Sequence, residues 1–264
     1  MGEGIIRKPI TQLKTYNECL RYILDMAELM LASGGEIHRV EKTIRYMAKA
    51  YGATTVDVFV ITTNIIVTAL FENGIELTQH RQIPTGRKLD YTKVEALNRL
   101  SRECCKQPLP LEALENKIQE IDQMNDNMLI WYLASMLGAG AFAVFFGGSF
   151  WDGLVSAGFA LFICFLQKKF APVCPNNVIF YLITSLITGI GIGLVGKGVP
   201  MLHADMIMIG DIMLMIPGLG ATNAVRDVLA GDTISGILRL IEALLWAAAL
   251  AAGFMIALRL VGGL

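Results

Sequence analysis

The chain has 264 residues, of which 54% are hydrophobic and 17% charged, and its formal net charge is -1. This balance supplies no basic field of the kind that nucleic-acid binding needs, so nucleic acid is not an expected partner. Its 5 cysteines include no C-x-x-C pair, which indicates neither a disulfide framework nor a zinc site, and no metal or cofactor is expected.

The two halves of the sequence differ in composition. Residues 1–126 are charged and amphipathic and begin without an apolar secretory segment, whereas residues 127–264 are apolar, glycine-rich and almost free of charge. We therefore expect an α-helical membrane protein with an N-terminal cytosolic α+β domain over 1–126. The membrane domain, over 127–264, should hold about five transmembrane helices.

The cytosolic half opens with apolar residues at helical spacing from Tyr16 to Leu31. SGGE at 33–36 follows, and then a second helix that stops at Gly52. Ser33 and Glu36 fit a capping box, so the stretch reads as a corner between two helices. The alternative is an anion site, because free amides at a helix N-terminus attract carboxylate or phosphate. The corner is the simpler interpretation.

The middle of the cytosolic half predicts a small antiparallel sheet. Three runs rich in β-branched residues, at 54–63, 64–71 and 75–80, read as strands, and Asn73-Gly74 between the last two is a hairpin signal. Amphipathic helices are expected at 90–106 and 111–121. The domain should therefore consist of helices packed on an antiparallel sheet.

Five apolar segments in the second half are candidate spans; the first four are near or below the length of about 20 residues that a bilayer requires, and the last is longer. The fourth is short and is broken by Pro217-Gly218. The loop lysines and arginines place the cytosolic domain and the second and fourth loops inside, and the C-terminus outside. The segments are 128–147, 151–166, 177–195, 206–219 and 234–260.

Two patterns resemble known sites but lie in the wrong context. Gly191-x-Gly193-x-x-Gly196 matches a dinucleotide fingerprint, yet it lies inside an apolar span, where small residues indicate close helix packing. Ile209-Gly210-Asp211 resembles part of an intramembrane aspartyl protease, but the nearest acid, Asp205, lies on the same helix. That chemistry needs two carboxylates that share a proton.

Charged residues within apolar segments are functional candidates, because ionisable groups are expensive at membrane depth. A helix broken by Pro and Gly is tolerated where it lines a cavity, and many transporters build a substrate site in this way. Asp232, Ser235, Arg239 and Glu242 fall on one stripe of the last span. We expect Arg239 to pair with Glu242 or Asp211 and to line the transport path.

With these residues in hand, the chain resembles the threonine/serine exporter family in its short form, a single five-span half. The resemblance covers most of the chain and rests on LASGGEIHRVEKTI, VDVFVITTNIIVT and MIPGLGATNAVRDVLAGDTISGILRLIEAL. It implies a cytosolic motif of Gly35, Glu36, Arg39, Val40 and Glu41. It also implies membrane motif positions at Pro217, Gly218, Asn223, Arg226, Asp227, Gly231, Asp232, Ser235, Gly236 and Glu242.

The expected function is a secondary exporter, not an enzyme, in a bacterial inner membrane. Its substrates would be small amino acids such as threonine and serine, or a small dicarboxylate such as succinate, driven by a proton gradient. The resemblance implies a smaller membrane subunit of the same family as partner, beside the lipid bilayer, and leaves a homo-oligomer open. The alternatives are a non-transporting regulatory subunit and an intramembrane aspartyl-type protease. Transport-path candidates are Asp211, Pro217, Gly218, Asn223, Arg226, Asp227, Asp232, Ser235, Arg239 and Glu242.

Overall fold

The computed structural model describes residues 4–84, 89–124 and 127–262, and these form two compact units. The first unit contains residues up to Met124 together with Thr222–Arg239, and the second contains Asn125–Ala221 and Leu240–Leu264. The segment 222–239 therefore packs with the N-terminal half. These units say nothing of where a membrane begins, so the division into a cytosolic domain over 1–126 and a membrane domain over 127–264 stays a prediction.

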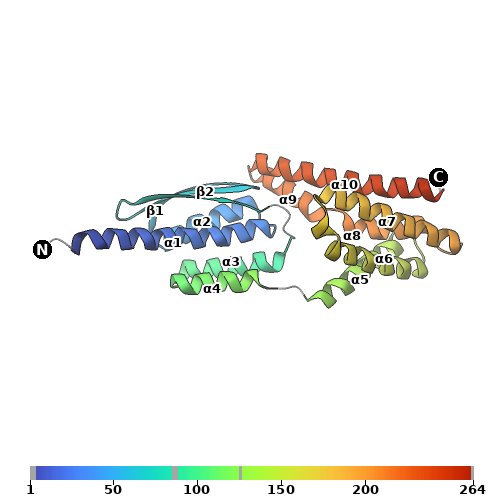
Figure 1. Ribbon diagram of the computed structural model, residues 1–264, viewed down its shortest axis with the longest axis horizontal. Coiled ribbons are helices and arrows are strands. Elements are labelled where there is room, and N and C mark those ends of the chain that lie inside the picture. The colour runs from blue at the N-terminus through green and yellow to red at the C-terminus, as the bar shows by residue number, and fades with distance from the viewer. Residues whose placement is uncertain (1–3, 85–88, 125–126, 263–264) are drawn as a thin grey trace. The chain divides into compact units, whose positions relative to one another are not determined.

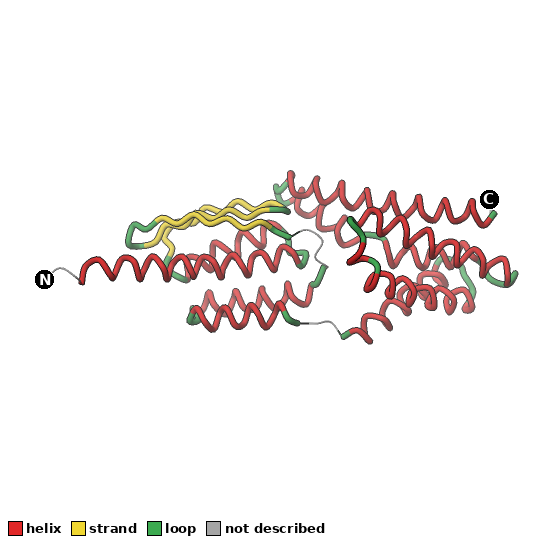
Figure 2. The backbone as a smooth tube through the Cα atoms, viewed as in Figure 1, coloured by secondary structure: helices red, strands yellow, loops and turns green. Residues whose placement is uncertain are grey.

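The first unit is a three-layer α+β structure (Figure 1). Helices α1 and α2 cover one face of a three-stranded sheet, and α3 and α4 pack on the other side of α1 (Figure 2). The core is built from apolar side chains of all three layers. The elements are α1 (Gly4–Ala32), α2 (Ile37–Ala50), β1 (Ala53–Ile61), β2 (Asn64–Phe71), β3 (Glu76–Gln82), α3 (Tyr91–Lys106) and α4 (Leu111–Asp122).

The sheet has the predicted antiparallel order β1-β2-β3, with Val58 opposite Val67 and Ile66 opposite His80. The predicted hairpin between β2 and β3 is confirmed, and Gly74 takes the positive φ of 72° that its turn requires. Helix α1 begins at Gly4, well before the predicted start near Tyr16. Apolar periodicity marked only the part from Cys19 onward that is buried against the core.

The described part of the second unit is helical, and four of the predicted apolar segments match a helix within a few residues, whereas the bent helical pair at the fourth runs to Leu229, well past the predicted end at 219. Within the described residues, four helices are long and apolar enough to cross a membrane, and the pair α8 and α9, bent at a break, would make a fifth span. The helices are α5 (Met128–Phe145), α6 (Phe150–Lys169), the short η1 (Ala171–Val173), α7 (Asn177–Gly198), α8 (Ala204–Met215), α9 (Gly218–Leu229) and α10 (Thr233–Val261). Helix α9 starts in the second unit and belongs to the first from Thr222 onward. Helix α10 starts in the first unit and belongs to the second after Arg239.

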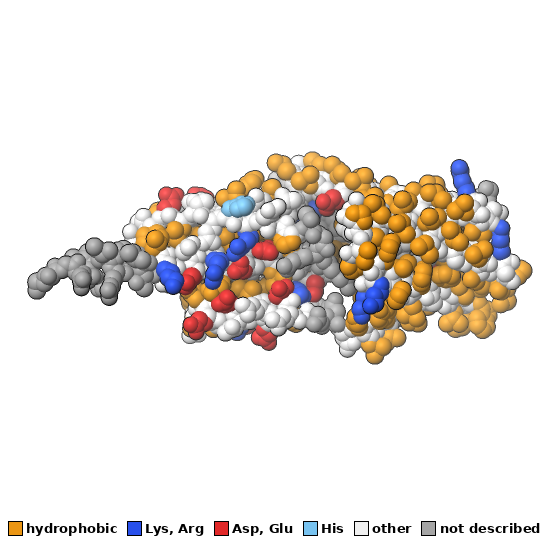
Figure 3. Space-filling view, in the orientation of Figure 1, with side chains coloured by type: hydrophobic (Ala, Val, Ile, Leu, Met, Phe, Trp, Pro, Cys, Tyr) orange, Lys and Arg blue, Asp and Glu red, His pale blue; other side chains and the backbone are white. Residues whose placement is uncertain are grey.

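Small residues bring the membrane helices close together. A Cβ added at Gly189 would lie 2.7 Å from the Ala257 side chain of α10, and one at Gly193 would lie 3.1 Å from Val261. The glycines of the fingerprint at 191–196 all lie within helix α7, so this stretch forms no phosphate-binding loop. The glycines instead allow close helix packing. The visible surface of these helices is largely hydrophobic (Figure 3). Such an apolar surface fits contact with lipid.

Candidate functional site

The first feature of the site is the corner between α1 and α2, at residues 33–36. Gly34 has a φ of 100°, its N–H donates to the Leu31 carbonyl, and the N–H of Gly35 donates to the Met30 carbonyl at 2.8 Å. These two bonds form a Schellman motif, which ends α1 with a left-handed glycine. A Cβ added at Gly35 would lie 2.8 Å from the Met30 carbonyl oxygen, so this position must lack a side chain.

The predicted capping box of Ser33 and Glu36 is wrong. Ser33 belongs to the end of α1, where its N–H donates to the Leu29 carbonyl, while Glu36 is the N-cap of α2 and its side chain makes no capping bond. The first amide of α2, that of Ile37, instead donates to Asp227 Oδ1 at 3.4 Å. The stretch is therefore a helix corner, as predicted, and its first helical amide donates to a carboxylate of the same chain. An anion site for a bound ligand stays a prediction.

Asp227 is the centre of the site. Its side chain is 1% exposed, and its Oδ2 accepts a hydrogen bond of 2.9 Å from Arg239 Nη1. The Arg239 side chain is itself only 15% exposed. Arg239 Nη2 also donates to the Gly35 carbonyl at 3.2 Å. Arg239 therefore pairs with Asp227, not with the predicted Glu242 or Asp211. One guanidinium ties α10 to both α9 and the corner.

Two further side chains of α9 reach the same corner. Asn223 Nδ2 donates to the Tyr91 hydroxyl at 2.8 Å and to the Gly34 carbonyl at 3.3 Å. Arg226 Nη1 lies 2.5 Å from Glu36 Oε1, and Arg39 contacts the other oxygen of that carboxylate at 3.2 Å. We call these interacting groups the corner cluster: residues 33–37 with Arg39, Tyr91, Asn223, Arg226, Asp227 and Arg239.

A tight turn between α9 and α10 makes the corner cluster possible. Gly231 has a φ of 99°, and the Asp232 amide donates to the Asp227 carbonyl at 2.9 Å, again a Schellman motif. A Cβ added at Gly236 would lie 2.7 Å from the Ala224 carbonyl oxygen, so the two helices meet backbone to backbone. This turn brings Asp227 opposite Arg239.

The other predicted residues of the first unit lie around this turn. Ser235 is buried, and Asp232 Oδ2 is buried without a hydrogen-bond partner among the described residues. Glu41 faces Arg45 at 4.0 Å. Burial raises the pKa of Glu41, and the charge of Asp232 raises it further, which links the cytosolic motif to the membrane motif.

The break in the predicted fourth span is confirmed. Helix α8 ends at Met215, and α9 begins at Gly218 after the non-helical residues Ile216 and Pro217. A proline ring prevents the helix from continuing through this point. Glu242, on α10 in the second unit, is exposed in the single chain.

Asp211 in the second unit is fully buried, and Ser156 Oγ donates to its Oδ1 at 3.2 Å. Among the described residues, no second carboxylate forms a hydrogen bond with Asp211. The aspartyl-protease alternative therefore has no acid pair in this geometry. Ser156 was not singled out from the sequence, because a lone serine in an apolar segment carries no signal of its own.

The second unit also buries Asp152, which the sequence analysis did not single out. It closes a capping box with Ser149 at the start of α6, and it accepts bonds from the His203 amide at 2.8 Å and from His203 Nδ1 at 2.9 Å. The pattern Ser-x-x-Asp at 149–152 could have identified it. The hydrogen bond and charge of Asp152 raise the pKa of His203, whose ring is 62% exposed.

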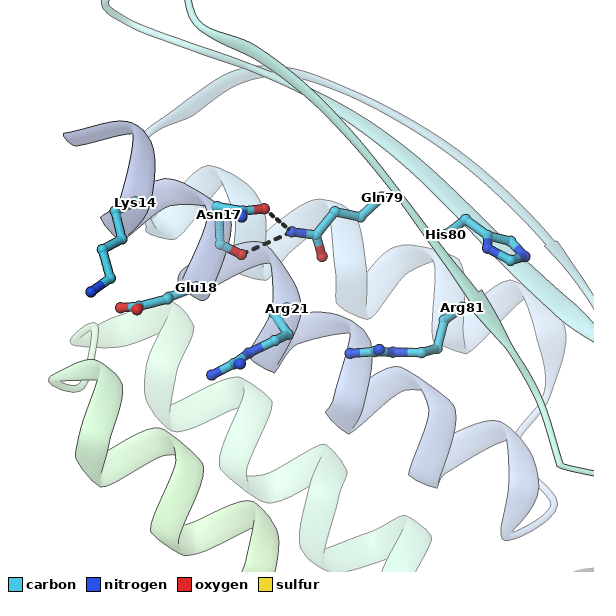
Figure 4. Close-up of a pocket in the computed structure, with 7 residues that line it drawn as sticks. All are labelled: Lys14, Asn17, Glu18, Arg21, Gln79, His80 and Arg81. Atoms are coloured by element: carbon cyan, nitrogen blue, oxygen red, sulfur yellow. Dashed lines mark hydrogen bonds between the residues drawn. The ribbon is translucent and has the colours of Figure 1, made fainter. Parts of the chain in front are cut away.

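A polar cavity of about 450 Å³ lies between α1 and β3, away from the corner cluster (Figure 4). Gln79 Nε2 donates to the Asn17 carbonyl oxygen at 2.9 Å, which ties the strand to the helix. Arg81 pairs with Asp25 and Glu28, so its charge is already matched. The cavity is lined by Lys14, Asn17, Glu18, Arg21, Gln79, His80 and Arg81.

One comparison with known proteins found a match. The family model described as "Putative threonine/serine exporter" matches residues 21–261. The chain belongs to this exporter family. The match includes every residue of the corner cluster, and it places the helices of the second unit in a family of membrane transporters. No curated protein and no solved structure matches the chain.

Proposed function

We propose that this exporter-family chain moves a small amino acid such as threonine or serine, or a small dicarboxylate such as succinate, out of the bacterial cytoplasm. It would lie in the inner membrane with its N-terminal domain in the cytosol and its C-terminus outside. A smaller membrane subunit of the same family would act with it, and a proton gradient would drive transport. The chain would carry out no catalysis.

The observation that carries this proposal is the Asp227 carboxylate, held between Arg239 and the first amide of α2. These two donors form a receptor for a carboxylate, since a helix N-terminus and a guanidinium both favour that group. Each proposed substrate also carries a carboxylate. In the state described here, the chain's own carboxylate fills the receptor.

The corner cluster thereby becomes a cytosolic gate. Substrate arriving from the cytosol would compete with Asp227 for Arg239, and release of Asp227 would loosen α9 and α10 from the corner. Arg226 and Glu36, which lie at the exposed edge of the cluster, would separate in the same step. The motif residues Gly35, Glu36, Arg39 and Glu41 belong to this gate.

The proposed transport path runs from the gate to the break between α8 and α9. The positive end of the α9 helix dipole would hold the substrate carboxylate, as half-helix ends do in other transporters. Asp211 and Glu242 are the acids available for proton coupling. The remaining path residues are Pro217, Gly218, Asn223, Asp232 and Ser235.

Counterflow of labelled threonine, serine and succinate in proteoliposomes tests the function. Vesicles loaded with unlabelled substrate should accumulate the same labelled substrate when they contain this chain with its partner subunit. Vesicles with this chain alone determine whether the partner is required. The absence of flux for every substrate in both preparations would contradict an exporter and would favour a regulatory subunit.

A further inference from the structure

Among its described residues, the second unit buries two acidic side chains, and their surroundings differ sharply. Asp152 and Asp211 are each 0% exposed. Asp152 accepts hydrogen bonds from the Ser149 amide and from two nitrogens of His203, which suits an ionised carboxylate. Asp211 receives one hydrogen bond, from the Ser156 hydroxyl, and its Oδ2 has no partner among the described residues.

Asp211 lies seven residues into α8, about 10 Å along the axis from the first residue of that helix. The backbone packs tightly around it. A Cβ added at the neighbouring Gly210 would lie 2.5 Å from the Ala139 carbonyl oxygen and 2.6 Å from Ser156 Oγ. Helix α8 is therefore pressed against α5 and α6 at this level.

No cation among the described residues pairs with Asp211. Helices α5, α6 and α7 pack against α8. None of the ion pairs formed among the described residues includes Asp211. The charged or titratable residues that the four helices carry, apart from Asp211, are Tyr132, Asp152, Cys164, Lys168, Lys169, Tyr181, Lys197 and Asp205. The lysines lie in the last turns of α6 and α7, and Asp152 is engaged by His203.

An ionised carboxylate in such a place would lack the donors that water gives it, and burial of that kind is costly. A neutral carboxylic acid has no net charge to compensate and can keep the bond from Ser156. The conformation described here therefore favours the acid with its proton.

We propose that Asp211 is the proton-binding site of the exporter, present here in its proton-loaded form, and that Ser156 positions its carboxyl group. This inference rests on the proposed transport function and deepens it, since it assigns coupling to Asp211 and not to Glu242. A proton from the outer aqueous phase binds Asp211 Oδ2. It is released to the cytosol in exchange for one substrate molecule moving outward, and no other bond forms or breaks.

The first test separates substrate exchange from proton coupling in proteoliposomes. Wild type should show counterflow and should also concentrate labelled substrate when a pH gradient is imposed. Asp211→Asn, which keeps the shape of the side chain, should keep counterflow and lose the pH-driven component. Asp205→Asn, an exposed acid on the same helix, is the matched control and should keep both. An Asp211→Asn protein that still responds to the pH gradient would overturn the proposal.

A second variant addresses the positioning role. Ser156→Ala removes the donor that stabilises the ionised carboxylate, so Asp211 should hold its proton more tightly. The pH at which pH-driven transport is half-maximal should then shift upward. An unchanged pH profile would overturn the role of Ser156.

The last measurement does not depend on transport. Infrared spectra of the purified wild-type protein at neutral pH should contain the C=O stretching band of a neutral carboxylic acid, and Asp211→Asn should lack it while Asp205→Asn keeps it. If wild type transports nothing but shows this band, the exporter function fails and the proton site stands. If the band is the same in wild type and Asp211→Asn, the proton site fails whatever the flux.

Discussion

Removing the guanidinium of Arg239 should destabilise the protein far more than removing that of Arg226. In Arg239→Met the apolar stem stays, but the Asp227 carboxylate remains 1% exposed with the Ile37 amide as its remaining donor among the described residues. A buried charge left without its partner costs about 3–5 kcal/mol. Arg226 is 55% exposed in its pair with Glu36, and an exposed pair contributes only about 0–1 kcal/mol.

Thermal unfolding of the purified full chain in one detergent, followed by circular dichroism, measures this difference. At about 2–4 °C per kcal/mol for a chain of this size, Arg239→Met should lower Tm by roughly 6–20 °C and Arg226→Met by less than about 4 °C. The double variant Asp227→Asn/Arg239→Met should recover most of the loss, because no buried charge is left unpaired. Equal small shifts for the two arginine variants would refute the reasoning, as would a double variant that recovers nothing.

Three further outcomes are expected. Gly35→Ala should lower Tm by several degrees because its Cβ would lie 2.8 Å from a backbone oxygen, whereas Gly220→Ala, with open space around it, should leave Tm unchanged or raise it. Gly210→Ala should lower both Tm and the counterflow rate, because its Cβ would meet backbone and hydroxyl oxygens within 2.6 Å; wild-type behaviour would argue against tight packing there. The hydrogen bond and charge of Asp152 raise the pKa of His203 above 6.5, so stabilisation by the protonated pair is complete below that pH and is lost as pH rises through the raised pKa. The difference in Tm between wild type and His203→Gln should therefore be largest in mildly acidic buffer, and a difference that grows toward alkaline pH would contradict this sign.

Most elements of the fold follow from local sequence patterns. Apolar residues at helical or alternating spacing locate α2, β1 and β2 because each of these elements buries one face against the core. The same rule explains why α1 was predicted only from near Tyr16, since residues 12–15, just before it, are exposed and bury no face against the core. In the membrane half, length and hydropathy locate the spans, and Pro217 marks the break.

The contacts of the candidate site lie beyond such patterns. The stripe on the last span places Arg239 one turn from Glu242, but its partner Asp227 lies across the turn between α9 and α10. Gly231 and Gly236 were the signals of that turn, since one reverses the chain and the other allows the two helices to touch. The bond from Ile37 to Asp227 joins residues 190 apart, and no spacing rule predicts a contact at that range.

The central claim is that the corner cluster must open and close again in each export cycle. Exchanging the charges of Glu36 and Arg226 tests it most directly, because their side chains, 20% and 55% exposed, meet at the edge of the cluster.

Glu36→Arg and Arg226→Glu should each slow threonine counterflow by about five- to thirtyfold, because an attraction becomes a repulsion with a difference of about 1–2 kcal/mol. The double variant Glu36→Arg/Arg226→Glu should restore most of the rate and keep Tm near wild type, whereas each single variant should lower Tm by no more than about 2–8 °C. Single variants that transport at the wild-type rate, or a double variant as slow as either one, would contradict the gate.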